Sequence, residues 1–85
     1  MTQARPVILN VDDQDPERYI KTRDLKQNGF EVIEAKTGAE ALRLIEHFRP
    51  PVVLLDVQLP DISGFEVCAF IKQKWPDVMV LQTSA

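Results

Sequence analysis

Three aspartates stand where apolar segments of the chain end. Asp12 and Asp13 directly follow the segment VILNV, and Asp56 is the last residue of VVLLD. A strand that is buried on both faces is an unfavourable place for a charge. Carboxylates at the ends of such strands therefore raise the question of what they bind.

Three carboxylates brought close together repel one another unless they are protonated or bound to a cation. A hard divalent ion such as Mg²⁺ fits, because it takes one or two carboxylates and keeps several waters. An aspartate beside Mg²⁺ is a plausible nucleophile toward phosphorus, and the ion would offset charge on the transferring group. The alternatives stay open at this point: the pair Asp12 and Asp13 suits a loop or a helix cap, and Asp56 suits a turn.

The alternation of patterns predicts how these residues are positioned. Apolar runs indicate strands, and stretches with helical spacing of apolar residues lie between them. Asp15 is expected to cap the first helix with Pro16 in its first turn, and Thr37 and Ser63 begin capping boxes for the next two. The strands are expected at residues 7–11, 31–35, 52–56 and 78–81.

The expected fold class is therefore α/β, a parallel sheet with helices on both faces in the order (βα)3β. Ligands of such open sheets bind beyond the carboxyl ends of the strands. We expect the three aspartates to meet at this edge, together with the hydroxyls of Thr83 and Ser84. Arg18, Lys21 and Arg23 give the first helix a basic side, which is expected to be a solvated face.

Composition limits the class of protein. The 85 residues predict one domain, 1–85, with 45% hydrophobic and 27% charged residues. A net charge of -3 argues against binding nucleic acid through electrostatics. The apolar stretches are too short to span a membrane, and the single cysteine, Cys68, favours a cytoplasmic location.

Four motifs together resemble the receiver domain of two-component response regulators. They are VDDQ at 11–14, GFEVIEAKTGAEAL at 29–42, LLDVQLPDISGFEV at 54–67 and VLQTSA at 80–85. The resemblance covers the whole chain and implies a flavodoxin-like, doubly wound sheet. It also implies phosphorylation by a histidine kinase or a phosphotransfer protein, in a Mg²⁺-dependent way. Under this resemblance, docking of the phosphodonor is the alternative role for the basic side of the first helix.

The resemblance implies a role for each site residue. Asp56 matches the phosphoacceptor, Asp13 the direct Mg²⁺ ligand, and Asp12 the acid that holds the ion through water. Gln58 matches the position whose backbone carbonyl also binds the metal. Ser84 matches the switch hydroxyl that moves toward the phosphoryl group, while the neighbouring threonine is one residue too early and is expected to be a strand residue.

The family pattern continues beyond Ala85 with a helix, a strand that ends in a lysine, and a last helix. We therefore expect a truncated receiver. Its phosphorylation without that lysine is in question, and its apolar fourth strand is expected to mediate self-association. The alternative function is a non-catalytic, self-associating fragment that no longer holds phosphate. A metal-dependent phosphohydrolase is disfavoured, because Gln58 stands where a second acid would be needed. The ending VLQTSA is similar to receivers of hybrid sensor histidine kinases.

Overall fold

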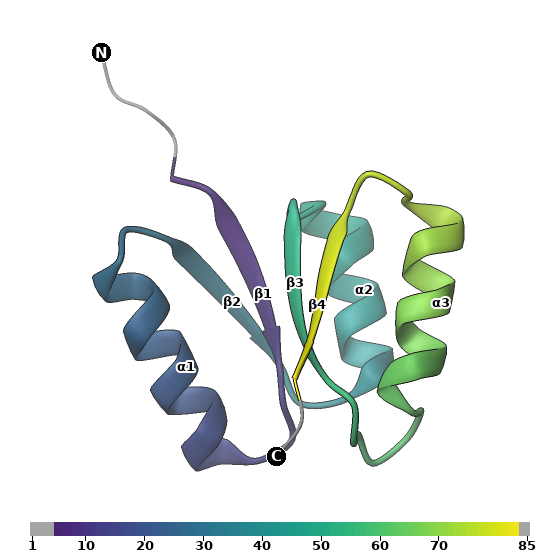
Figure 1. Cartoon of the computed structure of the whole chain (residues 1–85), viewed down its shortest axis with the longest axis horizontal. Coiled ribbons are helices and arrows are strands. Elements are labelled where there is room, and N and C mark those ends of the chain that lie inside the picture. Colours follow the sequence, from purple (N-terminus) through teal and green to yellow (C-terminus); the bar gives the residue numbers. More distant parts are fainter. Residues whose placement is uncertain (1–4, 84–85) are drawn as a thin grey trace.

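The computed structural model describes residues 5–83 as a four-stranded parallel sheet with three helices. The strand order is β2-β1-β3-β4, so β1 and β3 form the centre of the sheet. Figure 1 shows the alternation of strands and helices along the chain. In chain order the elements are β1 (Val7–Val11), α1 (Asp15–Gln27), β2 (Glu31–Ala35), α2 (Gly38–Phe48), β3 (Val52–Asp56), α3 (Gly64–Lys74) and β4 (Met79–Thr83).

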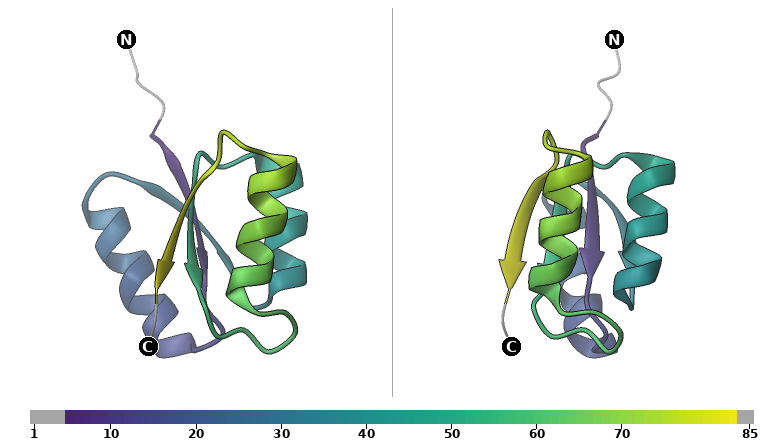
Figure 2. Two further views of the ribbon diagram at one scale, coloured as in Figure 1. Left: turned by 45° about the vertical axis from the view of Figure 1, so that its right-hand side comes forward. Right: turned by 90° about the vertical axis from the view of Figure 1, so that its right-hand side faces the viewer.

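The helices cover the two faces of the sheet unequally. Helix α1 packs on one face against β1 and β2, and α2 and α3 lie together on the other (Figure 1). Figure 2 shows β4 at one edge of the sheet, with β3 as its neighbour. The main core fills the space between the sheet and the pair α2 and α3. Its fully buried members include Leu9, Val11, Ile45, Leu55 and Ile71.

The burial of the strands follows their place in the sheet. In β1 every residue from Ile8 to Val11 is buried, whereas β2 and β4 have several exposed positions. A central strand with neighbours on both sides and helices on both faces must be apolar almost throughout, as predicted. The fourth strand ends at Thr83, two residues later than expected. Thr83 pairs with Asp56, and the Thr83 carbonyl accepts a hydrogen bond of 3.0 Å from the Val57 amide.

Two of the three expected helix caps are confirmed. The side chain of Thr37 accepts a hydrogen bond from the Glu40 amide, and that of Ser63 accepts one from the Glu66 amide. The expectation for Asp15 is wrong.

Helix α1 already begins at Asp15, and Gln14 is the residue before it, without a capping bond from its side chain. The Asp15 carboxylate instead accepts a hydrogen bond from Arg18. The cap failed because the helix starts one residue earlier than the proline suggested, which turns the expected cap into a residue of the first turn. Within residues 5–83, every helix falls short of the length and apolar character that crossing a bilayer requires.

Candidate functional site

The carboxylates of Asp12, Asp13 and Asp56 meet at the carboxyl edge of the sheet. One oxygen from each lies within 4.8 Å of the others. Asp12 follows β1 and Asp56 ends β3, and these neighbouring strands are paired up to Val11 and Leu55. Asp12 and Asp56 are buried, and Asp13 is half-buried. The parallel pairing of the two central strands thus brings together residues that are far apart in the sequence.

Backbone amides fix the orientation of the two buried carboxylates. The Gln14 amide donates a hydrogen bond of 2.9 Å to Asp12 Oδ1, and the Gln58 amide donates one of 3.0 Å to Asp56 Oδ1. In both cases the donor lies two residues after the aspartate, a turn geometry that short acidic side chains favour. Each bond engages Oδ1 of its carboxylate and leaves Oδ2 for other partners.

The cluster opens into a pocket of about 540 Å³. The three carboxylates line it together with residues from α1 and from the end of β4. Thr83 is a strand residue, as expected, and it also lines the pocket. Ser84 lies outside the described residues. The described residues around the pocket are Asp12, Asp13, Gln14, Glu17, Ile20, Lys21, Asp56, Gln58 and Thr83.

Lys21 forms an ion pair inside this pocket. Its Nζ atom lies 2.9 Å from Asp12 Oδ2 and donates a hydrogen bond of 3.5 Å to Thr83 Oγ1. Burial by itself raises the pKa of Asp12, but the hydrogen bond from Lys21 and the amide of Gln14 outweigh it, so the pKa lies below its ordinary value of 3.8. The expectation that Lys21 belongs to a solvated face is therefore wrong.

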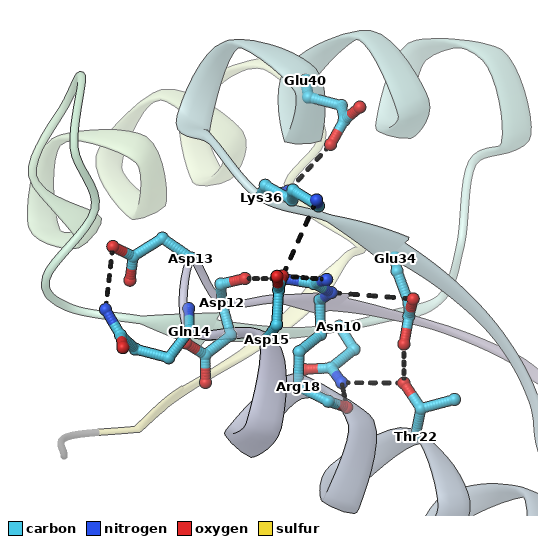
Figure 3. A network of polar contacts seen from close by, with 10 residues as sticks. All are labelled: Asn10, Asp12, Asp13, Gln14, Asp15, Arg18, Thr22, Glu34, Lys36 and Glu40. Carbon is cyan, nitrogen blue, oxygen red and sulfur yellow. Dashed lines mark hydrogen bonds and ion pairs between the residues drawn. The ribbon is translucent and has the colours of Figure 1, made fainter.

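Arg18 is also buried, with 8% of its surface exposed. Its guanidinium donates a hydrogen bond of 2.8 Å to the backbone carbonyl of Asp12 and one of 2.5 Å to Asp15 (Figure 3). The hydrogen bond from Arg18, followed by the charge of Lys36, lowers the pKa of the Asp15 carboxyl. Arg18 thus ties the start of α1 to the loop that carries the first two aspartates.

A polar network continues from Arg18 toward β2. Asn10 is fully buried in β1, and its Nδ2 donates to the Arg18 carbonyl and to Thr22 Oγ1, each at 3.0 Å. The hydroxyl of Thr22 donates in turn to Glu34, which also lies 3.6 Å from the Arg18 guanidinium (Figure 3). Among the described residues, Asn10 Oδ1 has no partner. These bonds hold α1 against the sheet through polar contacts, which explains why so polar a helix packs there.

Reasoning from sequence missed the contribution of α1 to the pocket, although a signal was present. Ile20 and Lys21 lie three and four residues after Glu17, so both are neighbours of Glu17 on the surface of a helix. Because α1 begins only two residues after Asp13, its first turns lie near the acidic edge of the sheet. All three residues line the pocket.

Comparison with known proteins identifies the family of this chain. The family model described as "Response regulator receiver domain" matches residues 8–85. The chain belongs to the response regulator receiver family. Response regulator MprA of Mycobacterium sp. (strain KMS) is 41% identical to this receiver over 78 residues, which are 92% of this chain and 34% of that protein. This receiver therefore spans about a third of the length of the response regulators that it matches.

Solved receiver structures share the fold. The response regulator TrrA from Thermotoga maritima, in complex with Mg²⁺-BeF, superimposes with a TM-score of 0.91 at 34% identity, over 94% of this chain and 70% of that one. The chemotaxis protein CheY4 of Vibrio cholerae gives a TM-score of 0.88 at 30% identity, over 93% and 68%. The expected flavodoxin-like α/β fold of a receiver in two-component signalling is confirmed.

Proposed function

We propose that this receiver accepts a phosphoryl group on Asp56 from a histidine kinase or a phosphotransfer protein. The observation that carries the proposal is the meeting of three carboxylates, with oxygens within 4.8 Å of one another, at the edge of the sheet. Asp56 lines a pocket large enough for a phosphoryl group, and the backbone amide of Gln58 donates a hydrogen bond to one of its carboxylate oxygens.

The donor atoms of this cluster fit Mg²⁺, which takes oxygen ligands and binds through one or two carboxylates with retained waters. The carboxylates of Asp12, Asp13 and Asp56 would hold the ion, and the backbone carbonyl of Gln58, another residue of the pocket, would complete the protein ligands. A bound ion would offset the negative charge of the carboxylates and of the transferring group. TrrA, a relative of this fold, was solved with Mg²⁺-BeF, which supports the same cofactor here.

In the proposed reaction a carboxylate oxygen of Asp56 attacks phosphorus and forms an acyl phosphate. The bond between phosphorus and the donor's histidine nitrogen breaks, and that nitrogen keeps the electron pair and takes up a proton. The Gln58 amide orients the carboxylate for attack. Ser84 remains the proposed switch hydroxyl. A cytoplasmic location belongs to the same proposal, since the free thiol of Cys68 suits a reducing compartment.

Incubation with acetyl phosphate, followed by intact-mass measurement, tests the proposal. We expect a gain of one phosphoryl group with Mg²⁺ and none with EDTA. Asp56→Asn should abolish the gain, whereas Asp61→Asn, which changes an exposed carboxylate five residues further on, should keep it. An unmodified wild-type chain that circular dichroism shows to be folded would contradict the proposal and favour the non-catalytic alternative.

We also propose that two copies of the 85-residue chain associate through β4. Among the described residues this strand pairs on one side only, with β3. Met79 and Leu81 on it are 55% and 48% exposed, and an open apolar edge of this kind recruits another strand. Sedimentation velocity over a range of concentrations tests the proposal. A dimer that Leu81→Lys dissociates is the expected result, and a wild-type monomer at the highest concentration would refute it.

A further inference from the structure

The ammonium group of Lys21 lies against the carboxylate that would help to hold the metal ion. It contacts Asp12 Oδ2 at 2.9 Å, on the oxygen that the Gln14 amide leaves free. The side chain of Asp12 is only 5% exposed and that of Lys21 only 26%. This pair is therefore better shielded from water than an ordinary surface salt bridge, and its attraction is correspondingly stronger.

Lys21 is the basic residue among the described residues that line the pocket, and the three carboxylates of the cluster line the same pocket. The same electrostatic argument that calls for a divalent ion applies to this ammonium group, because both reduce the repulsion among the acids. Two cations beside the same carboxylate repel each other, so a divalent ion at Asp12 must weaken the contact between Lys21 and Asp12. Lys21 is thus a cation within the chain that competes with the metal ion for the carboxylate of Asp12.

The position of Lys21 on α1 offers its ammonium group a second acidic partner when it leaves Asp12. Its ammonium is a single charge on a flexible stem of four carbons, so it can change partners without movement of the helix. Glu17 lies four residues earlier on the same helix and is exposed. This is the favourable order for an acidic and a basic residue one turn apart. Glu17 and Lys21 both line the pocket. An ion pair between them would therefore keep the ammonium group of Lys21 close to the pocket after it leaves Asp12.

We propose that Lys21 and a divalent cation compete for Asp12, so that Lys21 sets how tightly this receiver binds Mg²⁺. The inference rests on the proposed function, since it assumes that the acidic cluster binds the ion. Lys21 stabilises the pocket when metal is absent and raises the Mg²⁺ concentration at which the site fills. Lys21 is a residue that tunes affinity for the metal and takes no part in forming the acyl phosphate.

Isothermal titration calorimetry of the whole chain with MgCl₂ measures the affinity for Mg²⁺ and so tests this competition. Lys21→Met removes the charge and keeps a flexible side chain that favours helix. It should tighten Mg²⁺ binding by about fivefold, as expected for the loss of one partly screened charge a few ångströms from the ion. Lys21→Arg keeps the charge and should stay within about twofold of the wild type. Lys26→Met makes the same change of charge further along α1, away from the pocket residues, and serves as the matched control.

Thermal denaturation provides a second readout that does not depend on activity. In EDTA, Lys21→Met should melt below the wild type, because the three carboxylates lose their counterion. In saturating Mg²⁺ this difference should shrink, because coupling between two ligands of one site is reciprocal. Equal Mg²⁺ affinity of the wild type and Lys21→Met, or weaker binding by the variant, overturns the inference alone. Absence of Mg²⁺ binding to both chains overturns the inference together with the proposed metal site.

Discussion

Gly64, the first residue of α3, lies directly against the backbone of the proposed phosphoacceptor Asp56. A Cβ atom at Gly64 would lie 2.4 Å from the Asp56 carbonyl oxygen and 2.5 Å from the Val57 Cα atom. The Gly64 amide also donates a hydrogen bond of 2.9 Å to the Val57 carbonyl. The loop after β3 therefore folds back so that the start of α3 supports the segment that carries Asp56, and this approach requires glycine.

Gly64→Ala is expected to displace this segment, because both atoms in the way belong to the backbone and cannot rotate aside. The predicted loss is about 2 kcal/mol of unfolding free energy, typical of a forced steric overlap, together with slower phosphorylation from acetyl phosphate. Gly29→Ala is the matched control. Gly29 has φ +92° and nothing within 4 Å of a built Cβ, so the change should cost about 1–2 kcal/mol through backbone strain and leave the phosphorylation rate unchanged. Equal rates in both variants would show that Gly64 does not position Asp56.

Arg18→Met should destabilise the fold and disturb the acidic loop. The change removes the hydrogen bond to the Asp12 carbonyl and the buried partner of Asp15 and Glu34. Loss of such a buried charged donor costs about 3 kcal/mol, measured as unfolding by urea. Arg23→Met removes an arginine that is 52% exposed, and its effect should stay within about 0.5 kcal/mol. A similar small effect for Arg18→Met would mean that the network is not structural.

Asp61 gives stability a defined dependence on pH. It accepts hydrogen bonds from the Gly38 and Ala39 amides at the start of α2, at 2.8 and 2.9 Å. The Ala39 and Gly38 amides lower the pKa of the Asp61 carboxyl below 3.8. Because the folded pKa is depressed, the stabilisation is present above the unfolded pKa and is lost as pH falls through the folded pKa.

At pH 7, Asp61→Ala should therefore cost about 0.5–1 kcal/mol, in the lower part of the range for caps because Asp61 is exposed. The difference in unfolding free energy between wild type and variant should shrink as pH falls below 3.8. Urea denaturation across this pH range measures it. A difference that grows on acidification would contradict the assignment of Asp61 as a charged cap of α2.

Asp13→Asn should have opposite effects on the metal-free and metal-bound protein. It relieves repulsion within the cluster, which should raise the melting temperature in EDTA by about 4–8 °C if the relief is about 1 kcal/mol. It should also remove the rise in melting temperature that Mg²⁺ produces in the wild type. Asp24→Asn neutralises an exposed carboxylate of α1 and should leave both melting temperatures almost unchanged. An Asp13→Asn chain that Mg²⁺ still stabilises fully would exclude Asp13 as a ligand.

The strands and the position of the acidic cluster could be predicted because each depends on a local pattern plus one general rule. The apolar runs that end in Asp12 and Asp56 indicate buried strands. The rule that strands in such a sheet are parallel then brings their carboxyl ends together. Neither step needs knowledge of individual side-chain contacts. The resemblance to receivers supplied the order of the strands, and the structure has this order.

The roles of Arg18 and Lys21 could not be predicted in the same way, since both depend on how α1 packs. A basic residue on a polar helix is usually solvated, and the burial of Arg18 follows from a network that joins α1, β1 and β2. Likewise, Asp15 looked like a cap because the sequence around it suits one. Its contact with Arg18 became visible only with the helix in place.

The proposed function requires that Asp56 is the residue that takes the phosphoryl group. Borohydride reduction of the chain treated with acetyl phosphate and Mg²⁺, followed by peptide mass spectrometry, identifies an acyl phosphate by the reduced side chain that it leaves. We predict reduction at residue 56 alone, lost when Mg²⁺ is omitted. Modification of Asp12, Asp13 or Asp61 with an intact Asp56 would contradict the central claim.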